Sequence, residues 1–374
     1  MDILRPQSAD EMAHLLHECA SAGQSIHMGG AFTKRRMGGP VPNTDVTLST
    51  SALAGVLEYE PRDLTISVGA GMPFAELTKL LAANGQMVPL DPPFFEQATV
   101  GGVIAANTSG PRRRLYGSAR DLIIGMTFAT LEGKLVKSGG MVVKNVAGLD
   151  MGKLMIGSFG TLAVMTSLNF KLQPSPEMER TFVLRFATAD EVFHSRDAII
   201  GGVLQPSAVD VVNPAAAQRL GLDGWCLLVR AGGNTKVMDR YARELSSAEA
   251  LNEQEASALW TRVREFTPQF LAQNKEGSVV RVSTTLVEQK SAVESFDVPV
   301  VARAASGVCY AYFADSGGAT LNGRKGAIEY APEDRKAALD LWPSPGSDFG
   351  MMKKIKEMFD PQNLLNRGRL YGRL

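Results

Sequence analysis

The pattern of apolar and polar positions predicts an amphipathic helix near the start of the chain and a run of short strands after it. Ser8 and Glu11 have the spacing of a capping box, and apolar side chains follow at helical intervals until Gly23. A second helix is expected to begin at Pro73 and to end before Asn84. Around these helices, apolar runs predict strands at residues 25–28, 46–48, 56–59 and 65–68.

The pattern changes near residues 173–176, which have the Pro- and Ser-rich composition of a linker. Before the linker, residues 87–174 are expected to form mainly short strands and glycine turns. Beyond it, strands alternate with helices rich in Ala and Glu, which is typical of a separate α+β layer. Those strands are predicted at residues 182–186, 208–212, 226–229, 279–282 and 308–312.

A last helix is expected at residues 348–359, because Met352, Ile355 and Phe359 share one face and Asp360-Pro361 follows. The chain therefore divides into three predicted segments, residues 1–175, 176–345 and 346–374.

Composition and charge narrow the class of protein. Hydrophobic residues make up 45% of the 374 residues, which suffices for folded cores and argues against disorder. Lys and Arg total 39, as do Asp and Glu, so no net positive field attracts nucleic acid. The run of three arginines at residues 112–114 is a local patch, more typical of a solvated loop than of an anion site. No signal peptide or membrane span is visible, and three widely spaced cysteines suit a reducing compartment, so we expect a cytoplasmic location.

Three familiar glycine signatures fail when their spacing is checked. Residues 69–71 resemble the start of a dinucleotide fingerprint, but Phe74 stands at the third glycine position. Residues 148–154 resemble a P-loop, but Leu154 replaces the hydroxyl residue that binds magnesium. Residues 157–160 lack the pattern of a hydrolase nucleophile.

Histidine is too scarce to suggest a metal centre. His14 and His17 lie outside the apolar stripe of the first helix, which favours a solvated face over a metal site. His27 ends a strand just before Gly29, and its position fits a neighbour of a flavin or phosphate as well as an ordinary strand end. No metal ligand is predicted.

Three glycine-rich segments remain, at residues 28–34, 91–121 and 157–164. Exposed backbone N–H groups in such turns form nests for anions, and Thr33, Ser109 and Ser118 could add hydroxyl donors. Tight turns in a β-rich domain also need glycine, so each segment alone is weak evidence for a bound ligand. Their occurrence together favours a diphosphate cofactor bound largely by main chain, with structural turns as the alternative.

These segments resemble the FAD-binding domain of the vanillyl-alcohol oxidase and p-cresol methylhydroxylase (PCMH) flavoprotein family. The matching motifs are Gly29-Gly30, Thr99-Val100-Gly101-Gly102, Asn107 to Gly110, Tyr116-Gly117 and the segment 157–164. The stretch Gly139-Gly140, Val142, Lys144-Asn145-Val146-Ala147-Gly148 and Asp150, with the tail at residues 355–361 and 366–369, looks like the E subunit of bacterial glycolate oxidase.

The resemblance implies an α+β fold: a two-subdomain PCMH-type FAD-binding domain over residues 1–175, a smaller ferredoxin-like α+β cap over 176–345, and a C-terminal segment returning to the FAD domain. It also implies FAD, held without a covalent bond, since no histidine follows the first glycine pair. The cofactor-binding residues would be Gly29, Gly30, Ala31, Phe32, Thr33, Pro92, Thr99, Gly101, Gly102, Asn107, Ser109, Gly110, Gly117, Ser118, Asp121, Gly157 and Val164.

The chain also departs from that family. Leu149 stands where relatives carry an aromatic residue, Arg367 replaces a proline, and His194 is the lone histidine in the second segment, where related dehydrogenases carry a cluster. No catalytic base is identified. Lys144, Asn145, Arg281 and Arg369 are candidates by charge and position only. Lys144 and Asn145 would stabilise reduced flavin, or are simply a solvated Lys and a turn Asn.

The expected function is that of an FAD-binding subunit of a 2-hydroxy-acid dehydrogenase or oxidase complex, with glycolate as substrate. Its expected partners are a sibling FAD-linked catalytic subunit and an iron–sulfur subunit, with no nucleic acid and at most peripheral membrane association through partners. A non-catalytic FAD-binding relay or assembly subunit and a stand-alone FAD-dependent oxidase are the alternatives.

Overall fold

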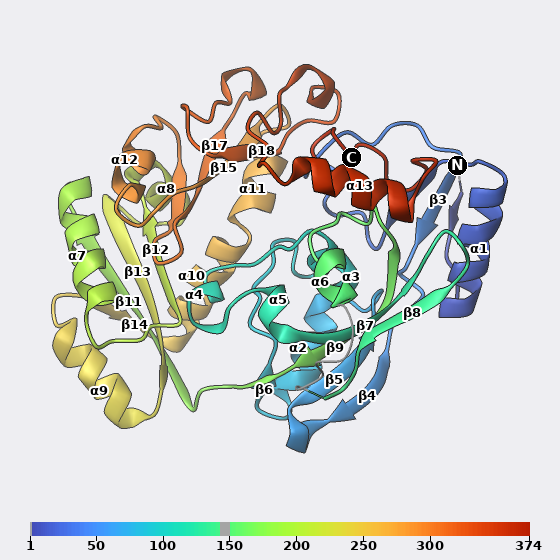
Figure 1. The fold of residues 1–374 in the computed structure, drawn as a ribbon. Coiled ribbons are helices and arrows are strands. Elements are labelled where there is room, and N and C mark those ends of the chain that lie inside the picture. Colours follow the sequence, from blue (N-terminus) through green and yellow to red (C-terminus); the bar gives the residue numbers. More distant parts are fainter. Residues whose placement is uncertain (1, 143–149) are drawn as a thin grey trace. The chain divides into compact units, whose positions relative to one another are not determined.

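The computed structural model describes residues 2–142 and 150–374, and it divides into two compact units (Figure 1). Unit 1 comprises Met1–Ser109, Ser118–Ser175 and Pro345–Leu374, and unit 2 comprises Gly110–Gly117 and Pro176–Ser344. The short segment Gly110–Gly117 thus groups with the second half of the chain, a placement that the sequence did not indicate. What each unit binds is a separate question.

Unit 1 contains a small parallel sheet in which β3 (Val46–Ser49) lies between β1 (Ile3–Leu4) and β2 (Ile26–Gly29). Helix α1 (Ala9–Ser21) has Ser8 as its N-cap, whose hydroxyl accepts the Glu11 N–H as expected. The Glu11 carboxylate accepts the Gln7 N–H instead of the Ser8 N–H, so half of the expected capping box forms. Its apolar face packs Met12 and Leu16 against Ile26 and Leu48 in one buried cluster. This packing fixes the end of β2, where the first glycine segment begins.

The larger sheet of unit 1 is antiparallel. Its five strands run in the order β4 (Val56–Glu60), β5 (Thr65–Gly69), β9 (Val164–Lys171), β7 (Ile123–Ala129) and β8 (Leu135–Gly139). A buried cluster joins this sheet to α2 (Phe74–Ala82) and α3 (Val100–Ala105) through residues such as Phe74, Val103 and Phe170. A further antiparallel pair, β6 (Gln86–Met87) and β10 (Gln173–Pro174), closes the unit.

The expectation that residues 87–174 form mainly strands and glycine turns is wrong in part. The segment contains the short helices α3, α4 (Arg113–Tyr116), α5 (Ala119–Leu122) and α6 (Met151–Met155). Side chains at the helix starts explain three of the four: Thr99 caps α3, Ser118 and Asp121 form a capping box on α5, and Asp150 caps α6. Helices of four to six residues are too short to show a 3.6-residue period, so apolar spacing could not reveal them.

The C-terminal segment packs on unit 1. Helix α13 (Phe349–Phe359) contributes Ile355 and Phe359 to the core cluster that contains the five-stranded sheet. Beyond the helix, Leu365 forms an isolated parallel bridge with Ile26 of β2, and the Ile26 N–H donates to the Leu364 carbonyl. The tail therefore lies beside the strand that leads into the first glycine loop.

Unit 2 is built on one eight-stranded sheet. Its strand order is β14 (Glu249–Leu251), β11 (Met178–Phe186), β13 (Trp225–Gly233), β12 (Ala208–Val212), β16 (Val300–Arg303), β17 (Val308–Phe313), β15 (Ser278–Ser283) and β18 (Gly326–Tyr330). The expected strands are all present, but β14, β16 and β18 were not foreseen. The expectation of a ferredoxin-like cap remains a prediction.

Helices lie against both faces of this sheet. Phe182 of β11 stacks on Tyr241 of α9 (Thr235–Glu244), whereas its neighbour Thr181 accepts a hydrogen bond from Trp260 of α10 (Glu253–Arg264). Because successive residues of a strand point to opposite faces, α9 and α10 cover opposite faces. Helices α7 (Ala189–Gly201), α8 (Pro214–Arg219), α11 (Phe266–Gln273) and α12 (Gln289–Glu294) complete the unit (Figure 1).

Among the described residues, the helices are all too short or too polar to cross a membrane.

Candidate functional site

The first glycine segment forms a loop over a hollow in unit 1. Strand β2 ends at Gly29, and residues 29–34 then line a hollow of about 570 Å³, including the part open to solvent. A second hollow of about 370 Å³ shares Gly29, Gly30 and Gly102 with it, so the two are adjacent. His27 lines the first hollow, with its ring 5.0 Å from that of Phe32.

The other two glycine segments supply the walls of the same hollows. Gly102, Ala105 and Ala106 come from α3 and its C-terminal end, and Phe159 comes from the third segment. The two walls are joined by backbone, because the Gly157 N–H donates to the Ile104 carbonyl at 3.1 Å and the Phe159 N–H donates to the Ala105 carbonyl at 2.9 Å. Three segments far apart in sequence are thereby brought to one place.

Close packing explains why residues 29 and 30 are both glycine. A Cβ added to Gly30 would lie 2.0 Å from the Thr99 hydroxyl oxygen, and one added to Gly29 would lie 2.5 Å from the Phe32 ring. The loop is therefore pressed against the residue that caps α3. Any larger side chain at Gly30 must push the loop away from the helix.

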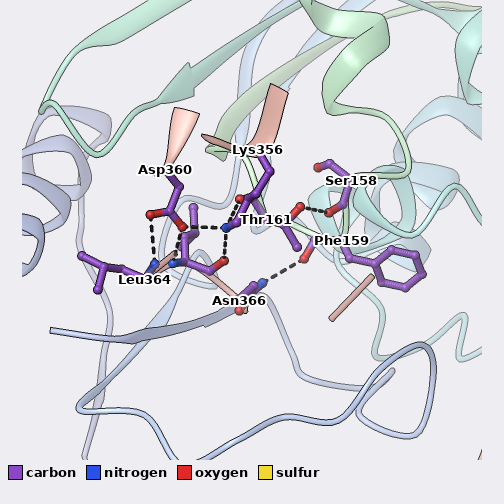
Figure 2. A network of polar contacts seen from close by, with 8 residues as sticks. Ser158, Phe159, Thr161, Lys356, Asp360, Leu364 and Asn366 are labelled. Carbon is purple, nitrogen blue, oxygen red and sulfur yellow. Dashed lines mark hydrogen bonds and ion pairs between the residues drawn. The ribbon is translucent and has the colours of Figure 1, made fainter. Parts of the chain in front are cut away.

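A buried lysine ties the C-terminal tail to the third segment, as Figure 2 shows. The Lys356 ammonium donates to the Thr161 carbonyl at 2.8 Å, to the Leu365 carbonyl at 3.0 Å and to the Asp360 carboxylate at 2.6 Å. Asp360 in turn accepts the backbone N–H groups of Leu364 and Leu365. Burial lowers the pKa of Lys356, while Asp360 opposes that shift.

Asn366 continues this network to the loop (Figure 2). Its side chain accepts the Met28 N–H at 2.7 Å and donates to the carbonyls of Met28 at 3.0 Å and Phe159 at 2.8 Å. One amide thus fixes the end of β2 against the third glycine segment. A positive φ of 44° at this position suits Asn better than most residues.

Arg369 is a structural support of the hollow rather than an open cation. Its guanidinium donates to the carbonyls of Lys34 at 3.0 Å, Arg35 at 3.2 Å and Gly39 at 3.0 Å. The side chain is buried and also lies over the Phe159 ring. These contacts hold residues 34–39 in place. The sequence indicated only that the C-terminal tail returns to this part of the chain.

The chemistry of the hollow fits a diphosphate cofactor. Within residues 2–142 and 150–374, the backbone N–H groups of Ala31, Phe32 and Thr33 donate no hydrogen bond to the protein. The side-chain Oδ1 of Asn107 is buried and has no hydrogen-bond partner in the same ranges. Phe32, Asn107 and Phe159 adopt positive φ values of 54°, 49° and 54°, and such strain gathers where backbone is shaped for a ligand. Free donors in a tight loop form an anion nest.

The predicted cofactor residues fall into three groups, of which only the first lines the hollows. Those lining the two hollows are Gly29, Gly30, Ala31, Phe32, Thr33, Thr99, Gly101, Gly102 and Val164. Asn107 and Gly157 are neighbours, because a Cβ on Gly157 would meet that of Asn107 at 3.4 Å. The others line neither hollow: Pro92, Ser109, Gly110, Gly117, Ser118 and Asp121.

Ser118 and Asp121 have a structural role of their own. The Asp121 carboxylate accepts the Ser118 N–H at 2.7 Å and its hydroxyl at 2.9 Å, which completes the capping box of α5. Of the catalytic candidates, Arg369 lines the hollow and Arg281 lies on β15 of unit 2. Lys144 and Asn145 lie outside the described residues. All these assignments to the cofactor or to catalysis remain predictions.

Residues that the sequence analysis did not assign to a functional site have structural roles or ordinary surface positions. A Cβ on Gly69 would meet the Leu53 carbonyl at 2.1 Å, and one on Gly71 would meet the Thr50 carbonyl at 1.9 Å, so this pair serves chain packing. His14 is exposed and lies 3.3 Å from Glu18. The described ranges contain no group of three or more His, Cys, Asp or Glu side chains placed to hold a metal ion.

Comparison with known proteins identifies the family of the chain. The family model described as an FAD binding domain matches residues 3–139. Glycolate oxidase subunit GlcE of Escherichia coli is 30% identical, over 92% of this chain and 92% of that protein. Glycolate oxidase subunit GlcD of Bacillus subtilis is 24% identical, over 99% of this chain and 89% of that protein.

A crystal structure of p-cresol methylhydroxylase with substrate bound has the same fold. Its TM-score is 0.75 at 14% sequence identity, over 99% of this chain and 88% of that one. The PCMH-type fold expected from the glycine segments is confirmed by this similarity.

Proposed function

Because this chain belongs to the family of FAD-binding glycolate oxidase subunits, and is an FAD-dependent oxidoreductase, we propose that it oxidises a small 2-hydroxy acid, with glycolate as the substrate. The observation that supports this most is the similarity to GlcE along 92% of both chains. The hollow in unit 1, with its unpaired loop donors, adds a place for the cofactor.

We assign FAD binding to the chain's own loops. The N–H groups of Ala31, Phe32 and Thr33 would hold the diphosphate, while Gly102 keeps the wall of α3 open to the hollow. Asn366 and Arg369 hold the loop in place through backbone carbonyls. Bound FAD supplies the acceptor for two electrons and a proton equivalent, and the protein positions it.

The proposed partners are a sibling flavoprotein subunit and an iron–sulfur subunit. The relatives GlcE and GlcD are each named as a subunit of a glycolate oxidase, which supports a multi-subunit complex for this chain. The cytoplasm is the proposed location, in keeping with three unpaired and buried cysteines, Cys19, Cys226 and Cys309.

Anaerobic addition of glycolate to the purified, FAD-loaded chain tests this function. The proposal predicts that the visible flavin bands bleach and that an added iron–sulfur subunit restores them. Bands that stay oxidised until the sibling subunit is added would instead favour the relay role. Bands that never bleach, alone or in the complex, would contradict the proposed reaction.

A further inference from the structure

The run of three arginines at residues 112–114 lies in the segment Gly110–Gly117, which belongs to unit 2 although the chain on either side of it belongs to unit 1. The sequence favoured a solvated patch for this run. In the structure Arg113 is exposed, as expected, but Arg112 and Arg114 are half-buried. Two of the three side chains therefore have partners within the fold.

Arg114 contacts the chain just before β12. Its guanidinium donates to the Pro206 carbonyl at 2.9 Å and, from two nitrogens, to the Gln205 side-chain oxygen at 3.4 and 3.3 Å. Burial lowers the pKa of Arg114, because the side chain has left solvent for these acceptors. Helix α4, which carries Arg114, also packs against β12. Since hydrogen bonds from a charged donor are among the stronger ones, Arg114 anchors α4 to the sheet of unit 2.

Arg112 provides a second attachment to the same sheet. Its guanidinium lies 3.6 Å from the carboxylate of Glu179 on β11. The other oxygen of that carboxylate accepts a hydrogen bond from Arg230 on β13 at 2.6 Å. Because Arg230 orients the carboxylate, Arg112 meets an acceptor that is already fixed. The segment Gly110–Gly117 is thus attached to unit 2 at two different strands.

The attached segment joins two of the motifs that resemble FAD-binding turns, residues 107–110 and 116–117. The Gly117 N–H donates to the Arg113 carbonyl at 3.0 Å, and the Arg113 N–H donates to the Gly110 carbonyl at 3.3 Å. Gly117 has a φ of 81°, a conformation that glycine adopts without strain. The two predicted cofactor glycines are therefore connected through the turn of helix that carries the arginines, and a shift of α4 moves both of them.

The flanks of the segment have supports of their own in unit 1. The Thr108 N–H donates to the Val103 carbonyl at 3.2 Å, and the Ser118 N–H donates to the Asp121 carboxylate at 2.7 Å. These bonds fix the chain at residues 108 and 118. The contacts of the two half-buried arginines fix the residues between them.

We infer that Arg114, assisted by Arg112, is a positioning residue of the FAD site. By anchoring α4 to the sheet of unit 2, it holds Gly110 and Gly117 in the conformation that binds the cofactor, and it acts through the backbone without touching FAD. The identity of the cofactor rests on the proposed function. Because such coupling is reciprocal, bound FAD must in turn stabilise the anchored form of α4.

Titration of the full-length, FAD-free chain with FAD, followed by flavin fluorescence, tests this inference. We expect Arg114→Gln to bind FAD at least about fivefold more weakly than wild type, because the anchored form of the turn is less populated. Arg113→Gln is the matched control, since Arg113 is the neighbouring arginine and is exposed, and its affinity should equal that of wild type. Hydrogen exchange of residues 112–117 should slow when FAD binds to the wild type.

The unfolding free energy of each FAD-free variant is measured in urea, so that stability and affinity are separated. Lower stability of Arg114→Gln with unchanged FAD affinity of the folded chain would show a merely structural arginine and overturn the inference. Exchange of residues 112–117 that FAD leaves unaltered in the wild type would overturn it as well.

If Arg114→Gln does not fold, Gln205→Ala decides, since it removes one acceptor of Arg114 and leaves the Pro206 carbonyl. FAD affinity equal to that of wild type in this variant would then overturn the inference, while weaker binding would support it. A wild type that binds no FAD contradicts the proposed function and this inference together. Equal affinity in wild type and a folded anchor variant contradicts the inference alone.

Discussion

At the scale of single residues, Lys356 is the clearest example of a charge retained for structure. Its side chain is 6% exposed, and its ammonium joins α13, the tail and the third glycine segment through Asp360 and two carbonyls. Lys356→Met would leave the fully buried Asp360 carboxylate without its cation. We expect a loss of about 3–5 kcal/mol in the free energy of unfolding, the usual cost of breaking a buried pair.

Urea unfolding followed by circular dichroism measures this loss. Lys354→Met is the control, because Lys354 lies on the same helix but is exposed, and its replacement should change stability by less than about 0.5 kcal/mol. Equal effects of the two substitutions would mean that the buried ion pair contributes nothing.

Glu329 gives a pH-dependent prediction at the same scale. Its pKa is raised above the ordinary 4.5 by burial, so the unfolded chain loses this proton at lower pH than the folded chain. The wild type should therefore lose stability relative to Glu329→Gln as the pH rises from about 4.5 through the raised folded pKa. Below that window the two proteins should differ by a constant amount.

Denaturant unfolding of both proteins at a series of pH values provides the measurement. A wild type that gains stability over Glu329→Gln with rising pH would show that Arg281 outweighs burial and that the folded-state pKa is lowered.

At the scale of elements, the contact between the first loop and α3 determines the shape of the hollow. Gly30→Ala would place a methyl group 2.0 Å from the Thr99 hydroxyl oxygen, although its φ is not in the left-handed region. The loop must then move off the helix, and we expect FAD to bind at least roughly tenfold more weakly, a loss of about 1.4 kcal/mol. Flavin fluorescence during titration with FAD measures the affinity.

Gly350→Ala is the control for this change. An added Cβ at Gly350 on α13 meets no heavy atom within 4 Å, so FAD affinity should be unchanged and the helix slightly more stable. Unaltered FAD binding in Gly30→Ala would mean that the loop does not hold the cofactor.

The sequence predicted those helices and strands that have a long enough run of apolar residues or a recognisable capping motif. The Ser8 cap and the apolar run of β12 predicted helix and strand bounds close to those observed. Helix α3 was missed because six residues with two glycines show neither period nor propensity, and its existence depends on Thr99 and on packing against β9. Strand β16 was missed because Val300–Arg303 has only four residues, too few to show an apolar period.

At the scale of the whole molecule, motif resemblance predicted the PCMH-type fold, whereas the pairing of distant polar residues in the sheet of unit 2 could not be predicted. Strand register places Arg281 of β15 opposite Tyr310 of β17, and Asp210 of β12 opposite Arg303 of β16. Asn366 and Arg369 also act at long range, since each fixes backbone more than 300 positions earlier in the chain. Side chains that act through the carbonyls of distant loops leave no local sequence signal.

The proposed function depends on FAD binding to unit 1, which the visible absorption spectrum of the purified full-length chain reveals. We expect flavin bands, or their appearance on adding FAD with a stoichiometry of one per chain, and release of unmodified FAD when the protein is denatured. A chain that shows no flavin bands and takes up no added FAD would contradict it, and the glycine segments would then be structural turns.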